Sequence, residues 1–87
     1  MRKDTVRNIF TVVRCIGQAG NWIWYREIAR RTKLHHKTVA RIIETYLTMF
    51  IETQEVEPFK VKMVKLKPGT DLEKVAKFLS LKEKLKS

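Results

Sequence analysis

The stretch of sequence that decides the fold runs from Arg26 to Leu47 and reads REIARRTKLHHKTVARIIETYL. Its apolar residues recur at the spacing of amphipathic helices, first around Ile28 and again from Val39 onward. The polar run KLHHK between them predicts a tight turn. We therefore predict a helix over 25–32 and a second helix over 36–50.

The same stretch has a strongly basic character. No acidic residue lies between Glu27 and Glu44, and the basic residues of this interval are Arg30, Arg31, Lys33, Lys37 and Arg41. Two short helices, a tight turn and a basic face are typical of a helix-turn-helix that meets DNA. We expect His35 at the N-cap of the second helix, where Ser, Thr or Asp is usual.

Length and composition restrict the chain to one small domain, 1–87. Of its 87 residues, 44% are hydrophobic and 32% are charged, a balance that suits a folded domain. The formal net charge of +10 favours a polyanionic partner, with nucleic acid first and an anionic membrane surface second. A generally basic surface without a specific partner is the alternative.

Neither disulfides nor membrane insertion are expected. Cys15 is the only cysteine, and its apolar helical surroundings predict a buried thiol. No signal peptide and no run of apolar residues long enough to span a membrane is visible. We therefore expect an intracellular, cytoplasmic protein associated with the nucleoid.

Elements on both sides of the opening stretch indicate an α+β fold. Before it, helical spacing predicts a helix over 4–18, and clustered aromatic residues predict a short extended segment over 21–25. We expect Trp22 and Trp24 to lie in the core; a platform for stacking single-stranded bases is the alternative.

The remainder of the chain predicts a hairpin and a helix. Alternating residues favour strands over 51–56 and 59–66, joined by a turn at Glu57-Pro58. After it, Thr70 and Glu73 have the spacing of a capping box, which predicts a helix over 70–86.

This order of elements resembles the winged helix-turn-helix family of transcriptional regulators, and small dimeric regulators of archaea and their viruses look most similar. The residues that carry the resemblance are Glu27-Ile28-Ala29, Leu34, Lys37-Thr38-Val39, Ile42-Ile43, Leu47 and Phe50-Ile51. The resemblance covers nearly the whole chain. It implies a mainly helical α+β fold with the helix-turn-helix over 25–50, a wing sheet of two to three antiparallel strands over 51–67, and an extra C-terminal helix. Two departures from the family are Lys33, where many members have Gly or Asn, and His35-His36, where a Ser-rich helix start is more typical.

The family also implies that the helix over 36–50 enters the major groove of DNA. The residues expected to contact DNA are His35, His36, Lys37, Thr38, Arg41, Arg30, Arg31, Lys33, Lys60 and Lys62. Arg41 projects outward, where a guanidinium reaches O6 and N7 of a guanine, and Lys37 lies one turn earlier on the same side. The start of a helix favours phosphate, which suits His36 and Thr38.

The remaining basic residues have less specific roles. We expect Arg30, Arg31 and Lys33 to line the DNA backbone, and Lys60 and Lys62 to reach a phosphate or the minor groove from the wing. Alternatives remain open: Thr38 caps or packs, the two arginines form a solvated face, and the wing lysines pair with the hairpin's own glutamates. Glu44 on the outer face limits DNA reading to the first half of the helix.

We therefore expect a sequence-specific double-stranded DNA-binding regulator that forms a homodimer through its first and C-terminal helices. A non-specific DNA-packaging protein and a winged helix that binds other proteins are the alternatives. No phosphate-binding glycine loop, Ser-His-Asp set or close carboxylate pair predicts an enzyme. Adjacent histidines point about 100° apart on a helix, so His35 and His36 make a poor chelating pair, and we expect no metal or other cofactor.

Overall fold

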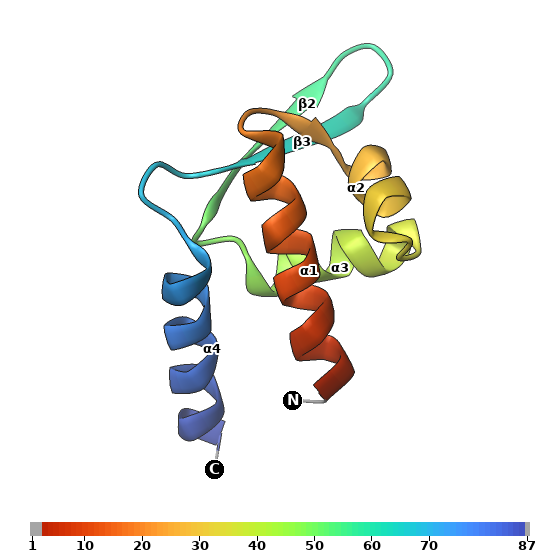
Figure 1. Ribbon diagram of the computed structural model, residues 1–87. Helices are drawn as coiled ribbons and strands as arrows, with labels where there is room; N and C mark the ends of the chain where they lie inside the picture. Colours follow the sequence, from red (N-terminus) through yellow and green to blue (C-terminus); the bar gives the residue numbers. More distant parts are fainter. Residues whose placement is uncertain (1–2, 87) are drawn as a thin grey trace.

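A computed structural model describes residues 3–86, with side chains described through residue 81. Its elements, in chain order, are α1 (Lys3–Ala19), β1 (Ile23–Trp24), α2 (Tyr25–Thr32), α3 (His36–Tyr46), β2 (Ile51–Val56), β3 (Val61–Leu66) and α4 (Leu72–Lys86). The described residues therefore form a small, mainly helical α+β domain with four helices and a three-stranded antiparallel sheet (Figure 1).

The sheet has the strand order β1-β3-β2, so β3 is its central strand. Ile23 of β1 pairs with Val64 of β3, and Val64 also pairs with Thr53 of β2. Partners across an antiparallel ladder share a face, so Ile23 and Val64 lie side by side, and both are buried. The predicted extended segment thus forms a short strand that joins the start of the chain to the later hairpin.

The core lies between α1, the α2–α3 pair and the inner face of the sheet. Its fully buried side chains come from every helix and from the central strand: Ile9, Val12, Val13, Ile16, Ile28, Val39, Ile42, Ile43, Leu47, Val64 and Val75. Figure 1 shows α1 running through the middle of the molecule, with α4 on one side and α2 with α3 on the other. Cys15 is buried as predicted, and desolvation by burial raises the pKa of its thiol.

The turn between α2 and α3 is tight, as predicted, and the structure defines its conformation. Lys33 adopts the left-handed conformation with φ 61°, which glycine or asparagine would reach at lower cost. The Thr32 hydroxyl donates to the Ile28 carbonyl at 2.7 Å and accepts from the Leu34 N–H at 3.3 Å. His35 caps α3, because its Nδ1 accepts a hydrogen bond from the Lys37 N–H at 3.1 Å.

Helix α3 is shorter than predicted and ends at Tyr46 instead of residue 50. The Leu47 N–H closes the last turn on the Ile43 carbonyl at 3.2 Å, and the Phe50 N–H then donates to the Leu47 carbonyl at 2.9 Å. This tight turn brings both ends of the connection into the core, because Leu47, the C-cap of α3, and Ile51, the first residue of β2, are both buried. Helical spacing alone does not reveal where such a turn begins.

The hairpin also differs from its prediction at the turn. Strand β3 begins at Val61 instead of residue 59, and Phe59 and Lys60 belong to the connection, which contains a cis Glu57-Pro58 peptide. Lys60 has φ 53°, a left-handed conformation that ends the alternation of the strand.

The two tryptophans do not lie in the core as predicted. Trp24 is 40% exposed on the outer face of the sheet, while Trp22 is half-buried. The Lys65 ammonium lies 4.9 Å from the centre of the Trp22 ring, which makes a cation–π contact. The inner face of the small sheet is filled by aliphatic side chains, which leaves the larger rings outside.

Helix α4 starts at Leu72, and its cap is Asp71, not the predicted Thr70. The Asp71 carboxylate accepts a hydrogen bond from the Lys74 N–H at 2.9 Å. Thr70 instead belongs to the preceding turn, where its N–H donates to the Lys67 carbonyl at 3.1 Å. The helix packs through Val75 and Leu79, which are buried. Its Phe78 ring meets Phe50 edge-on, with ring centres 5.3 Å apart.

The position of this cap generates a direct test. Asp71→Ala removes the acceptor for the Lys74 N–H and should lower the free energy of unfolding by about 0.5–2 kcal/mol. Thr70→Ala is the matched control and should have a clearly smaller effect. Urea unfolding followed by circular dichroism measures both variants. A larger loss for Thr70→Ala would restore the capping box and contradict the Asp71 cap.

Candidate nucleic-acid interface

Helix α3 separates a buried stripe from an exposed basic face. Val39, Ile42 and Ile43 are buried, because their spacing turns them all toward the core. On the opposite side, His36, Lys37 and Arg41 are exposed and lie on one face of the helix. This arrangement was predicted from spacing, and it leaves these side chains accessible to a large anionic partner.

The start of α3 contains two histidines and a threonine with different environments. The His35 and His36 rings stack with centres 4.4 Å apart, and both residues are exposed. His35 already uses Nδ1 for the helix cap, so its Nε2 edge is the one available for an external contact. Thr38 is only partly exposed, in keeping with the packing alternative. His36 and Lys37 are therefore the exposed polar side chains in the first turn of α3.

The two arginines of α2 share one carboxylate. Arg30 Nε donates to Glu27 Oε1 at 2.8 Å, Arg30 Nη2 contacts Glu27 Oε2, and Arg31 Nε donates to Glu27 Oε2 at 2.8 Å. The hydrogen bonds from Arg30 and then Arg31 lower the pKa of the Glu27 carboxyl from 4.5 to about 2. Arg30 and Arg31 are exposed, as is Lys33 in the following turn, but Glu27 neutralises part of their charge.

The hairpin lysines have different surroundings. Lys62 Nζ lies 3.9 Å from Glu44 Oε2, so β3 is linked to α3 by an ion pair. The sequence suggested partners within the hairpin, and that pairing occurs for Lys65, which lies 3.7 Å from Glu52. Lys60 is exposed in the hairpin turn. Of the two predicted hairpin contacts, Lys60 is therefore the more accessible.

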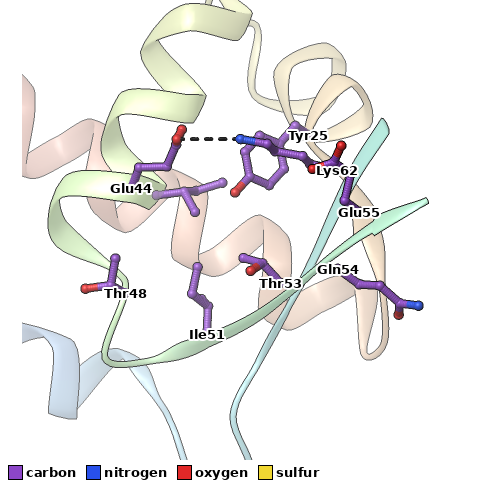
Figure 2. Close-up of a pocket in the computed structure, with 9 residues that line it drawn as sticks. Tyr25, Glu44, Thr48, Ile51, Thr53, Gln54, Glu55 and Lys62 are labelled. Carbon is purple, nitrogen blue, oxygen red and sulfur yellow. Dashed lines mark ion pairs between the residues drawn. The ribbon is translucent and has the colours of Figure 1, made fainter. Parts of the chain in front are cut away.

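A small pocket includes the Glu44–Lys62 ion pair in its lining. Figure 2 shows the two side chains pointing toward each other from α3 and β3, with the Tyr25 ring beside them. The pocket has a volume of about 240 Å³ and extends to Thr48 and Glu55. Burial and then the charge of Glu44 raise the pKa of the Tyr25 phenol. The pair holds the hairpin at a defined distance from α3.

A second groove lies between the outer face of α3 and the hairpin turn and has a volume of about 410 Å³. Its lining is Tyr25, Arg26, His36, Ala40, Phe59, Lys60, Val61 and Lys62. No carboxylate lines it among the residues that the structure describes. The groove thus brings the predicted residues His36, Lys60 and Lys62 together, although they are far apart in sequence.

Sequence reasoning missed Arg26 and Phe59 as part of this groove. Arg26 lies just before Glu27 and so fell outside the acid-free run. Phe59 was assigned to a strand, whereas the structure places it 81% exposed in the hairpin turn. The Glu57-Pro58 pair marked the turn, but no residue pattern indicated that the turn continues through Lys60.

Two of the three hairpin glutamates lie on β2, and the third, Glu57, is exposed in the hairpin turn. Glu52 and Glu55 are exposed on β2, which is an edge strand of the sheet. Charged side chains on an edge strand discourage pairing with other chains. Basic groups therefore gather along the outer face of α3 and in the groove beside it, while the glutamates lie on β2 and at the start of the hairpin turn.

Comparisons with protein-family models, with curated proteins and with solved structures give no significant match to this chain. The part of the chain that the structure describes contains no cluster of three His, Cys, Asp or Glu side chains suited to a metal ion. In the same part of the chain, no helix has the length and apolar character needed to cross a membrane. The functional proposal therefore depends on the residues of the interface.

The shared carboxylate predicts a specific pH dependence. Because the folded-state pKa of Glu27 is lowered from 4.5 to about 2, its ion pairs stabilise the fold above pH 4.5. This contribution is lost as the pH falls from about 4.5 to about 2. Urea unfolding of the wild type and of Glu27→Gln across this range should show the wild-type advantage shrinking toward acid pH. A difference that stays constant down to pH 2 would contradict the lowered pKa.

Proposed function

We propose that this protein is a sequence-specific double-stranded DNA-binding protein that regulates transcription as a homodimer. In this proposal α2 and α3 form a helix-turn-helix, the β2–β3 hairpin is the wing, and α3 enters the major groove. The single observation that carries the proposal is the exposed basic face of α3, formed by His36, Lys37 and Arg41 over a fully buried inner stripe.

The size and charge of α3 suit the major groove. An α-helix with its side chains is about 10–12 Å across, and the major groove of B-DNA is about 12 Å wide. The first half of α3 carries Lys37 and Arg41, while Glu44 follows one turn later and would repel phosphates if it were inserted. Base reading is therefore assigned to the first turns, with Arg41 as the principal base contact.

The flanking basic groups suit the DNA backbone. Arg30, Arg31 and Lys33 are exposed at the end of α2 and in the turn that precedes α3. Lys60 lies in the hairpin turn, on the other side of the groove that includes His36. Cations on both sides of a reading helix supply the sequence-independent part of DNA affinity, which is strongly dependent on salt.

A homodimer is supported by apolar surface left on α4. Leu72 is exposed, and Leu81 is 61% exposed, although the helix already buries Val75 and Leu79 within the domain. A second copy that covers α1 and α4 would bury this surface. Such a dimer predicts two half-sites related by two-fold symmetry and about 10 bp apart, or a multiple of that distance.

Selection of bound sites from random duplex DNA at two salt concentrations tests this proposal. A symmetric consensus that persists at the higher salt supports specific reading by a dimer. Enrichment without any consensus, lost at the higher salt, would instead support non-specific packaging, which the net charge of +10 also suits. Failure to bind duplex DNA at either salt concentration would overturn the proposal.

Replacing the principal base contact gives the sharpest mutational test. Arg41→Ala should lower specific affinity by about 1–3 kcal/mol and relax the preference at one base position. Lys67→Ala, which removes an exposed cation from the connection between β3 and α4, is the matched control and should leave that preference unchanged. Competition binding with the selected site and its single-base variants measures the effect. Equal loss on selected and random DNA would exclude base reading by Arg41.

The hairpin lysine tests the backbone contact. Lys60→Ala should weaken binding to all duplex sequences alike and reduce the slope of log affinity against log salt by about one. Lys67→Ala removes an exposed lysine from the connection between β3 and α4 and should leave the slope unchanged. Titrations at several salt concentrations measure both slopes. An unchanged slope for Lys60→Ala would place the hairpin turn away from the phosphates.

A further inference from the structure

The hairpin turn exposes the aromatic ring of Phe59, which a purely electrostatic contact with phosphates would not require. Phe59 is 81% exposed, and two further apolar side chains of the same region, Val61 and Trp24, are 37% and 40% exposed. These are three of the six large hydrophobic side chains that are exposed in the described part of the chain. Single exposed apolar residues are ordinary, but this local concentration at one corner indicates a contact surface.

The groove that Phe59 lines is cationic, although Glu57 lies two residues earlier in the same turn. Arg26, Lys60 and Lys62 line the same groove, together with His36 and Ala40 from the outer face of α3. The apolar ring therefore lies among positive charges and next to the helix face assigned to DNA reading. Figure 1 shows the β2–β3 connection at the far end of the hairpin, projecting beyond the helices. A projecting ring with flanking cations can enter a groove in a polyanion.

We propose that Phe59 is an apolar wedge that enters the DNA minor groove beside the major groove read by α3 and opens one base step. This inference rests on the proposed function, since it assigns a second contact within the same complex. A neutral ring gains nothing from a phosphate, but it loses contact with water when it lies against bases and deoxyribose. Proteins that insert apolar side chains in this way kink the duplex by about 20–90°.

The charge of the region favours DNA over a protein as the occupant. A surface of one charge sign selects a partner of the opposite sign, and duplex DNA carries about one negative charge per 1.7 Å of its axis. Here the groove beside Phe59 contains Arg26, Lys60 and Lys62, and the described residues contribute no carboxylate to it. Lys60 is the next residue in the chain and would hold the phosphate that flanks the opened step.

The experiment compares full-length wild type with Phe59→Ala, Phe59→Leu and Met49→Ala on the site selected from random duplex DNA. Met49 is the matched control, because it is 61% exposed in the connection between α3 and β2 and does not line the groove. Three quantities are measured for each variant: affinity, the slope of log affinity against log salt, and the bend angle from fluorescence resonance energy transfer between the DNA ends. Thermal unfolding and sedimentation velocity report on folding and self-association.

Phe59→Ala should lower affinity about tenfold, which is about 1.4 kcal/mol, and should reduce the bend angle. Its salt slope should stay at the wild-type value, because no charge is removed, whereas Lys60→Ala changes the slope. Phe59→Leu should retain most of the affinity and bend, since leucine is also an effective wedge. Met49→Ala should behave as the wild type.

Two results would overturn the inference while leaving the proposed function in place. In the first, Phe59→Ala binds and bends the selected site as the wild type does, while Arg41→Ala binds the same site more weakly. The other is a change in self-association of Phe59→Ala at unchanged DNA affinity, which would assign the ring to a protein contact. Failure of the wild type itself to bind duplex DNA would overturn both proposals, so the two failures are distinguishable.

Discussion

The burial of one stripe of α3 is the constraint on which the rest of the structure depends. Val39, Ile42 and Ile43 are almost completely removed from water, and they pack with Ile28 of α2 and with the apolar face of α1. An α-helix that buries such a stripe must present its other side to solvent. The exposure of Lys37 and Arg41 is therefore a direct consequence of core packing on the opposite side of the helix.

The central strand β3 then fixes the position of the hairpin relative to α3. Val64 is fully buried and pairs with both Ile23 and Thr53, so one strand joins the segment before α2 to the hairpin after α3. Trp24 ends β1 and is also the N-cap residue of α2. No loop separates β1 from α2, so β3, which pairs with β1, lies close to α2. The Glu44–Lys62 ion pair then links β3 to α3.

Ion pairs determine where positive charge remains available on the surface of this small domain. The net charge is +10, yet Glu27 partly neutralises two arginines and Glu44 contacts a hairpin lysine. Such exposed ion pairs contribute little to stability. Their larger effect is to hold cationic side chains in particular orientations around α3, next to the groove that Phe59 and Arg26 also line.

The sequence by itself determined where the helices lie and that His35 caps α3, because these features depend on residues within one or two turns of each other. It also identified the outward face of α3, since helical spacing assigns Arg41 and Ile42 to different sides.

Four local features were predicted wrongly. Helix α3 ends at Tyr46, β3 starts at Val61, Trp24 is exposed, and Asp71 replaces Thr70 as the cap of α4. Only the tertiary structure decided these features, together with the pairing of Lys62 with Glu44 and the meeting of Arg26, His36 and Phe59 around one groove. The physical reason is that each feature depends on which side chains, far apart in the sequence, pack together in the core. A local pattern of residues does not contain that information.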